Sequence, residues 1–323
     1  MSIFGHMKPS RIVKKAMDGL AGFRETTFAE DKAQYLEIIS KNFGRMTDIL
    51  YKKIDGEEAS SKSLQLINEI AATNFILDGI LILSNLPVEH RRQFTMIFTG
   101  AVAYKNNGES PLVKYIEQDP DIIDTIIHLY NNPELAITAG EMLRVCATYE
   151  SLTKQILSKS SVNQLFKFFT VPLFDVAADS FSLFREILLS SPIAKQYIRD
   201  NYDFIVEKLN QFSEKSHYAS SLQSLRLIRE LIETNEVFNM LYLSSDRNFD
   251  LILQHFTSQY KNIAIEALKI FKLFIDFKKS SEKIRKFTKD NKDNLIKYAD
   301  ALLDFPLDQS FRTNLIDTIQ NQQ

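Results

Sequence analysis

The residues that could do chemistry are few in this chain, and the most suggestive group is a run of carboxylates. Asp119, Asp121 and Asp124 follow the oxygen-rich spacing with which a calcium-binding loop begins. Such a loop also needs a glycine at its sixth position and a bidentate glutamate at its twelfth. Asp124 stands at the sixth position, where the glycine is needed, and Tyr130 stands at the twelfth, where the glutamate is needed. We therefore predict no metal site here.

Other candidates for catalysis or metal binding are scattered. None of the five histidines stands at ligand spacing from a cysteine or glutamate, and His128 lies in an apolar stretch that predicts a packing role. The single cysteine, Cys146, falls on an apolar face and is predicted to be a buried structural thiol. The chain has no P-loop, dinucleotide fingerprint or Gly-x-Ser-x-Gly motif. We therefore predict no cofactor and a protein that is not an enzyme.

One charge cluster stands out near the C-terminus. Between Lys278 and Lys297, eight basic residues face three acidic ones, while the whole chain carries a net charge of −2. A solvated helix face explains such a cluster, and so does a docking site for an acidic peptide. The sequence leaves both interpretations open.

A thirteen-residue pattern determines which elements must position these groups. Four copies begin at Leu135, Val176, Ser220 and Ile263, spaced 41, 44 and 43 residues apart. In each copy a small residue stands at offset 4, a bulky apolar one at offset 8, and two further, mostly apolar residues at offsets 11 and 12. These offsets, with offset 0, line one face of an α-helix. A helical period of 40–47 residues is typical of armadillo and HEAT arrays.

The predicted fold is all-α: an armadillo/HEAT-like, right-handed superhelical solenoid of three-helix repeats. Residues 1–60 are expected to form atypical capping helices, residues 61–305 the repeats, and residues 306–323 a polar tail that frays. Offsets 3, 6 and 10 are predicted to face the concave groove, where they carry mixed charges without a repeated code. The basic residue at offset 9 is predicted to extend past the core into solvent; it reads Arg144, Arg185, Arg229 and Lys272.

The composition limits which partners and which cellular compartment fit this chain. No global basic field exists to hold a nucleic acid. Residues Met1 to Lys15 lack the apolar core of a signal peptide, and Asp78 interrupts the most hydrophobic run, Phe75 to Leu83, so no membrane association is expected. With one cysteine, a reducing compartment is favoured. We predict a cytoplasmic protein.

The repeat helices also carry a family resemblance. The segments Leu135–Leu157, Leu173–Leu188, Gln223–Ile232 and Asn262–Ile275 resemble, in order and spacing, the calcium-binding protein 39 scaffolds. The resemblance extends at least from Val113 to Leu303. It implies an armadillo-like scaffold that binds and activates protein kinases of the sterile-twenty type, together with a pseudokinase.

The resemblance implies two binding surfaces. A C-terminal pocket would take the Trp-Glu-Phe tail of the pseudokinase, and its residues here would be Ile252, Leu253, Phe256, Lys289 and Leu295, with Leu253 replacing a family methionine. The concave face would hold the kinase or pseudokinase domain. Its aromatic contacts match Phe174, Tyr218 and Phe238, whereas Leu222 and Asn235 replace two family arginines.

Two alternatives remain at the level of sequence. A cargo adaptor that reads basic peptides would need ladders of Trp and Asn along the groove, but the chain has no Trp and no Asn at offsets 6 and 10 of the four copies. A passive assembly scaffold that activates nothing is compatible with every residue above.

Overall fold

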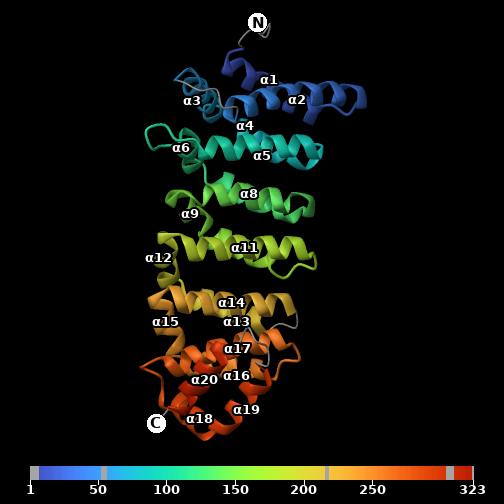
Figure 1. Cartoon of the computed structure of the whole chain (residues 1–323). Helices are drawn as coiled ribbons and strands as arrows, with labels where there is room; N and C mark the ends of the chain where they lie inside the picture. Colours follow the sequence, from blue (N-terminus) through green and yellow to red (C-terminus); the bar gives the residue numbers. More distant parts are fainter. Residues whose placement is uncertain (1–6, 52–56, 215–217, 303–308, 322–323) are drawn as a thin grey trace. The chain divides into compact units, whose positions relative to one another are not determined.

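The computed structural model describes residues 7–51, 57–214, 218–302 and 309–321, and within these ranges the secondary structure is helical, with no strand beyond one isolated bridge. Figure 1 shows the helices along the chain. They form two compact units, Met1–Ile187 and Leu188–Gln323. The predicted boundary at residue 60 does not coincide with this division, and the one at residue 305 lies outside the described residues.

Unit 1 is a pair of helices followed by three helical triplets. The pair is α1 (Pro9–Glu25) and α2 (Ala29–Tyr51); the triplets are α3 (Glu57–Ala71), α4 (Phe75–Ile82) and α5 (Val88–Ala103); α6 (Pro111–Gln118), α7 (Asp121–His128) and α8 (Ala136–Cys146); and α9 (Glu150–Ile156), α10 (Lys159–Phe168) and α11 (Phe174–Ser190). Equivalent helices pack in succession, α3 on α6 on α9, α4 on α7 on α10, and α2 on α5 on α8. Each triplet therefore buries its faces against its neighbours, as a repeat array requires.

Unit 2 is also built of helical triplets. Its triplets are α12 (Pro192–Asp200), α13 (Tyr202–Glu214) and α14 (Tyr218–Thr234); α15 (Glu236–Leu243), α16 (Asp246–Gln254) and α17 (Lys261–Asp276); and α18 (Glu282–Asp290), α19 (Lys292–Leu302) and α20 (Gln309–Gln320). The long helix α17 packs on α14 at one side and on α20 at the other.

The C-terminal tail differs from the expectation that it frays. Residues Gln309–Gln320 form α20, which packs on α17 and α19 and buries Leu315 and Ile319. The Lys292 ammonium donates to the Gln320 carbonyl at 2.8 Å, and Arg312 pairs with Asp300 at 2.8 Å. Two apolar side chains four residues apart are enough to dock one helical face, which the polar average of the tail concealed.

Many helices begin at a polar cap that the sequence supplies. The side-chain oxygen of the residue before the helix accepts a hydrogen bond from a backbone N–H in the first turn, which satisfies one of the unpaired donors there. This occurs at Ser110, Ser158, Asn235, Ser245 and Ser281. Such caps stop one helix of a triplet from running into the next.

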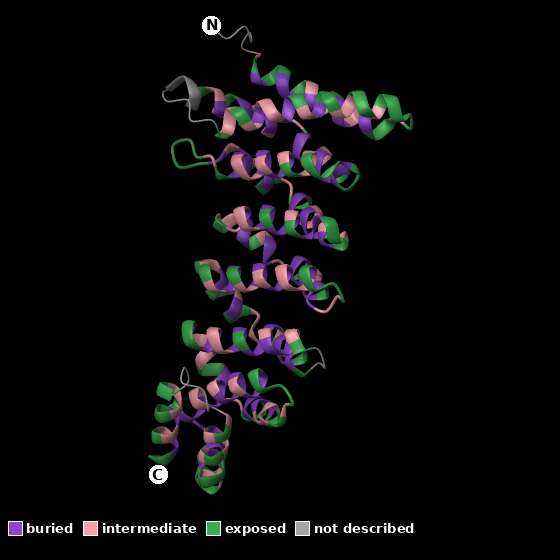
Figure 2. Ribbon diagram, turned by 45° about the vertical axis from the view of Figure 1, so that its right-hand side comes forward, coloured by how far each residue is buried: buried purple, intermediate pink, exposed green. Residues whose placement is uncertain are grey.

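The repeat pattern read from the sequence is confirmed. The four copies fall on α8, α11, α14 and α17, and every position at offsets 0, 4, 8, 11 and 12 is buried except Ala147 and Ser220, which are half-buried. Figure 2 shows buried and exposed residues alternating along these long helices. In the described ranges no single helix is long and apolar enough to cross a membrane, although the bent pair Ser61–Ala71 and Phe75–Asn85 meets that length and composition when taken together.

Ion pairs join successive long helices within each unit. In unit 1, Arg144 of α8 binds Asp179 of α11 at 2.9 Å and Glu186 at 3.0 Å, and the Tyr130 hydroxyl donates to Asp179 at 2.6 Å. Arg144 stands at offset 9 of its copy, and its two partners, Asp179 and Glu186, stand at offsets 3 and 10 of the next copy.

In unit 2, Arg229 of α14 binds Glu266 of α17 at 2.9 Å, again from offset 9 to offset 3. The prediction that these arginines extend into solvent is therefore wrong for Arg144 and Arg229. Each guanidinium group is held between two helices because a carboxylate of the next repeat lies within ion-pair distance. We call these contacts the inter-repeat ion pairs.

A substitution at Gly140 tests how tightly the ion pair of Arg144 and Asp179 is packed. A Cβ at this position would lie 2.1 Å from Asp179 Oδ2 and 2.5 Å from Arg144 Nη1. Glycine-to-alanine changes inside helices normally stabilise by about 1 kcal/mol. We expect Gly140→Ala instead to lower the free energy of unfolding by about 1–3 kcal/mol through overpacking, measured by urea denaturation.

Gly44 in α2 is the matched control, because a Cβ there meets nothing within 4 Å. Gly44→Ala should raise the unfolding free energy. If both substitutions stabilise equally, the ion pair tolerates the extra methyl and the close packing inferred at Gly140 is wrong.

Glu266 gives the second pair a pH signature. Burial works to raise the pKa of its carboxyl, but the hydrogen bond from Arg229 and the charge of Lys269 outweigh burial and hold the pKa below its ordinary value of 4.5. A depressed folded pKa means that the stabilisation is complete above about pH 4.5 and is lost as the pH falls through the folded value.

We expect Glu266→Gln to lower the unfolding free energy at pH 7 by about 2 kcal/mol, less than the roughly 3–5 kcal/mol for a fully buried pair, because Arg229 reaches solvent. The deficit should shrink below about pH 4.5, where wild-type Glu266 begins to protonate. Denaturation at pH 7 and pH 3.5 measures this, and a deficit that does not change with pH would contradict the assignment.

Candidate partner-binding surfaces

The clearest exposed aromatic cluster of unit 2 lies at the start of its long helices. Tyr218 is the first residue of α14, Tyr260 caps α17, and their ring centroids are 4.9 Å apart. The rings are 36% and 40% exposed. The Asn262 amide donates to the Tyr218 hydroxyl at 2.9 Å, which fixes the ring edge. A tyrosine pair with fixed orientation offers a large contact area at low entropic cost.

Phe174 is the equivalent residue of unit 1. It is the first residue of α11 and is 67% exposed, beside Leu173, which is 51% exposed. Single exposed apolar residues are common, but two adjacent ones at a helix start form a small apolar tip. Phe174 and Tyr218 thus each begin a long helix with the side chain exposed, and the partner contact assigned to them stays a prediction.

The other three residues assigned to the concave face are buried. Phe238 is fully enclosed, lying 5.5 Å from the ring of Tyr242 in a stacked arrangement and 5.5 Å from that of Tyr202. Asn235 caps α15 by accepting the Phe238 backbone N–H at 2.9 Å. Leu222 is also buried. The structure does not place the Phe238 ring where a partner could touch it, because α15 packs that face into the core.

The residues of the predicted C-terminal pocket lie on α16, the short turn His255–Thr257, α18 and α19. Ile252 is fully buried, Leu295 is buried, Leu253 and Phe256 are half-buried, and Lys289 is exposed. Phe256 stacks on Tyr298 of α19 with centroids 5.1 Å apart, and the Tyr298 hydroxyl donates to the Phe256 carbonyl at 2.6 Å. The structure thus joins Phe256 to the helix of Leu295; the peptide contact itself stays a prediction.

Sequence reasoning missed two aromatic residues at these surfaces. Tyr260 stands 42 residues after Tyr218, close to the repeat spacing, and this was a usable signal. No sequence signal pointed to Tyr298, because α19 lies beyond the four clear copies of the pattern. Both residues hold a predicted site residue in place.

The structure divides the basic cluster between Lys278 and Lys297. Lys283 pairs with Asp250 at 2.6 Å, Arg285 donates to the Ser280 carbonyl, and Lys292 holds the end of α20. These groups serve the fold. Lys278, Lys279 and Lys286 make no hydrogen bond or ion pair with the described residues, which leaves their charge for solvent or a partner.

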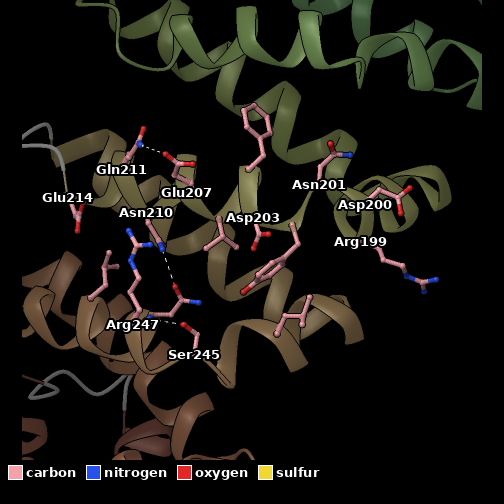
Figure 3. A pocket seen from close by; sticks show the side chains of 16 residues that line it. Arg199, Asp200, Asn201, Asp203, Glu207, Asn210, Gln211, Glu214, Ser245 and Arg247 are labelled. Carbon is pink, nitrogen blue, oxygen red and sulfur yellow. Dashed lines mark hydrogen bonds between the residues drawn. The ribbon is translucent and has the colours of Figure 1, made fainter.

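A large polar groove of about 1,000 Å³ opens in unit 2 along α12, α13, α15 and α16 (Figure 3). Figure 3 shows Arg199 at one end and Glu214 with Arg247 toward the other. The buried amide of Asn210 donates to Asn248 at 3.1 Å, so this part of the lining is already paired. The groove contains none of the predicted site residues.

The groups considered for chemistry are placed as follows. Burial raises the pKa of the Cys146 thiol well above its ordinary value. A His128 ring nitrogen lies 2.7 Å from the Asp124 carbonyl, within its own helix. Among the described residues, no group of three or more His, Cys, Asp or Glu side chains is arranged to hold a metal ion.

The chain matches a known family over almost its whole length. The Mo25-like family corresponds to residues 2–321 of this chain. The chain belongs to the Mo25-like family. The resemblance predicted from the repeat helices is thereby confirmed.

Relatives within the family match at low identity but over most of their length. The mouse calcium-binding protein 39-like protein is 29% identical over 296 residues, covering 91% of this chain and 87% of that protein. A Mo25-like protein of Schizosaccharomyces pombe is 28% identical over 275 residues, covering 84% and 83%. Among solved structures, a computationally designed armadillo repeat protein matches with a TM-score of 0.46 at 11% identity, covering 83% of this chain and all of that chain.

The buried position of Phe238 leads to a prediction about substitution. Phe238→Ala should lower the free energy of unfolding by about 3–5 kcal/mol, because it removes a fully enclosed ring. Phe174→Ala, at an exposed position, should change it by less than about 0.5 kcal/mol. Thermal melts followed by circular dichroism would distinguish the two, and an unchanged melt for Phe238→Ala would show that the ring is not part of the core.

Proposed function

We propose that this chain is a non-catalytic, cytoplasmic scaffold that binds a protein kinase or pseudokinase of the sterile-twenty type and stabilises its active conformation. Membership of the Mo25-like family over residues 2–321 is the observation that carries the proposal. The exposed aromatics at the start of α11 in unit 1, and at the starts of α14 and α17 in unit 2, support it, because each offers apolar contact area to a folded partner.

The mechanism is a shift of population. A kinase domain alone exchanges between open and closed arrangements of its regulatory helix. A rigid surface that binds the closed form more tightly by about 2.7 kcal/mol shifts the ratio about a hundredfold. Helix stacking and the inter-repeat ion pairs supply that rigidity, and no residue of this chain has to take part in chemistry.

The second surface is proposed to bind the Trp-Glu-Phe tail of a pseudokinase around Leu253 and Phe256. An apolar side chain of the tail would lie against these half-buried residues, and Lys289 would face its carboxylate. A bound tail raises the local concentration of the attached domain near the Tyr218–Tyr260 pair of the same unit. Two weak contacts then act as one strong contact.

The test uses a fluorescein-labelled peptide ending in Trp-Glu-Phe and follows its anisotropy with increasing protein. We expect micromolar binding that Leu253→Glu weakens at least tenfold. Leu81→Glu, at an exposed position on α4, is the matched control and should bind as wild type. Circular dichroism of each variant checks that it remains folded.

The same preparations, mixed with a sterile-twenty-type kinase, test the other surface. Kinase activity should rise with wild type and fall at least tenfold toward the basal value with Phe174→Ala/Tyr218→Ala, while peptide binding is unchanged. Peptide binding without any stimulation would favour a passive scaffold. Failure of both measurements would overturn the proposed function.

A further inference from the structure

An apolar hollow lies between α15 and the end of α17, within unit 2. Its volume is about 370 Å³, and most of its lining is apolar. Leu243 is buried at its base, Leu273 and Phe277 are half-buried, and Met240 is 46% exposed at the mouth. Asn239, Asp276, Lys278 and Lys279 complete the lining. We call it the α15–α17 hollow.

The polar residues of the hollow differ in whether they are already paired. The Asn239 amide donates to the Ile232 carbonyl at 3.0 Å, and Asp276 accepts from Lys272 at 2.5 Å. Lys278 and Lys279, in contrast, are exposed and make no hydrogen bond or ion pair with the described residues. The charge that the hollow presents to a ligand is therefore positive.

Hydrogen bonds at Ser280 fix the turn that carries these lysines. The buried Ser280 hydroxyl donates to the Phe274 carbonyl at 2.7 Å, and the Ser280 N–H donates to the Phe277 carbonyl at 2.9 Å. Arg285 donates to the carbonyl of the same serine. Both lysines thus project from a fixed backbone, so a ligand would not have to order the turn on binding.

We propose that the α15–α17 hollow is a docking site for an acidic linear peptide that inserts one bulky apolar side chain. The side chain would lie between Met240, Leu273 and Phe277, and carboxylates on either side of it would pair with Lys278 and Lys279. A methionine at the mouth adapts to several side-chain shapes, which suits a peptide site. Two adjacent unpaired lysines select negative charge.

The hollow is separate from both surfaces of the proposed function, with which it shares no residue. Tyr260 and Phe277 flank the two ends of α17, which has 16 residues and is therefore about 24 Å long. A ligand in the hollow leaves the Tyr218–Tyr260 pair free. This inference therefore stands or falls independently of kinase activation.

The experiment labels the seven methionine methyl groups with ¹³C and titrates the whole protein with a synthetic peptide, Gly-Asp-Glu-Phe-Asp-Glu-Gly. Met240→Leu identifies the Met240 signal. We expect that signal to shift on titration while those of the buried Met46 and Met142 do not. A peptide with Ala in place of Phe should bind at least tenfold more weakly, and raising NaCl from 50 to 500 mM should weaken both.

Two variants and a control complete the test. Met240→Glu and Lys278→Glu/Lys279→Glu should each weaken binding at least tenfold, whereas Lys286→Glu, an exposed and unpaired lysine on α18, should change it less than threefold. Equal binding of the Phe and Ala peptides, or an unmoved Met240 signal, would overturn the proposal. Sedimentation that shows a dimer for wild type and a monomer for Met240→Glu would also overturn the proposal, because a second copy of the chain would then be the occupant.

Discussion

A carboxylate on one long helix, neutralised by an arginine of the preceding one, fixes the rotation of successive repeats. Apolar stacking alone tolerates small rotations, since its energy depends on area rather than direction. The pair of Arg229 and Glu266 does not, because Glu266 is buried and would be left without its partner. The pair of Arg144 and Asp179 acts in the same way in unit 1. Rotation in turn decides which residues of each long helix face outward.

This use of charge limits what the outward faces can do. Offsets 3 and 10 were expected to give a mixed-charge groove, but Asp179, Glu186 and Glu266 are engaged by arginines of the same unit. Much of that charge is therefore unavailable for reading a peptide sequence. Among the exposed large apolar side chains, Phe174, Tyr218 and Tyr260 lie at the starts of long helices.

The repeat helices were predictable because offsets 0, 4, 8, 11 and 12 must be apolar or small wherever a long helix is covered on two sides. The helix α20 was not, because only Leu315 and Ile319 reveal its buried face within a polar tail. For the site, Phe174 and Tyr218 each stand two residues before a copy of the pattern, and each begins a long helix. The burial of Phe238 was not predictable, because matching a family residue by order gives its place in the chain but not the rotation of α15.

Leu222 and Asn235, where the resemblance implies arginine, are both part of the packing of unit 2. Asn235 is more than a neutral replacement, because its side chain caps α15 and is buried. An arginine at this position would lose that cap and would have to extend past the buried ring of Phe238. At Leu222, a charge would have to leave a buried position to reach solvent. The absence of charge at both positions is thus built into the packing of unit 2.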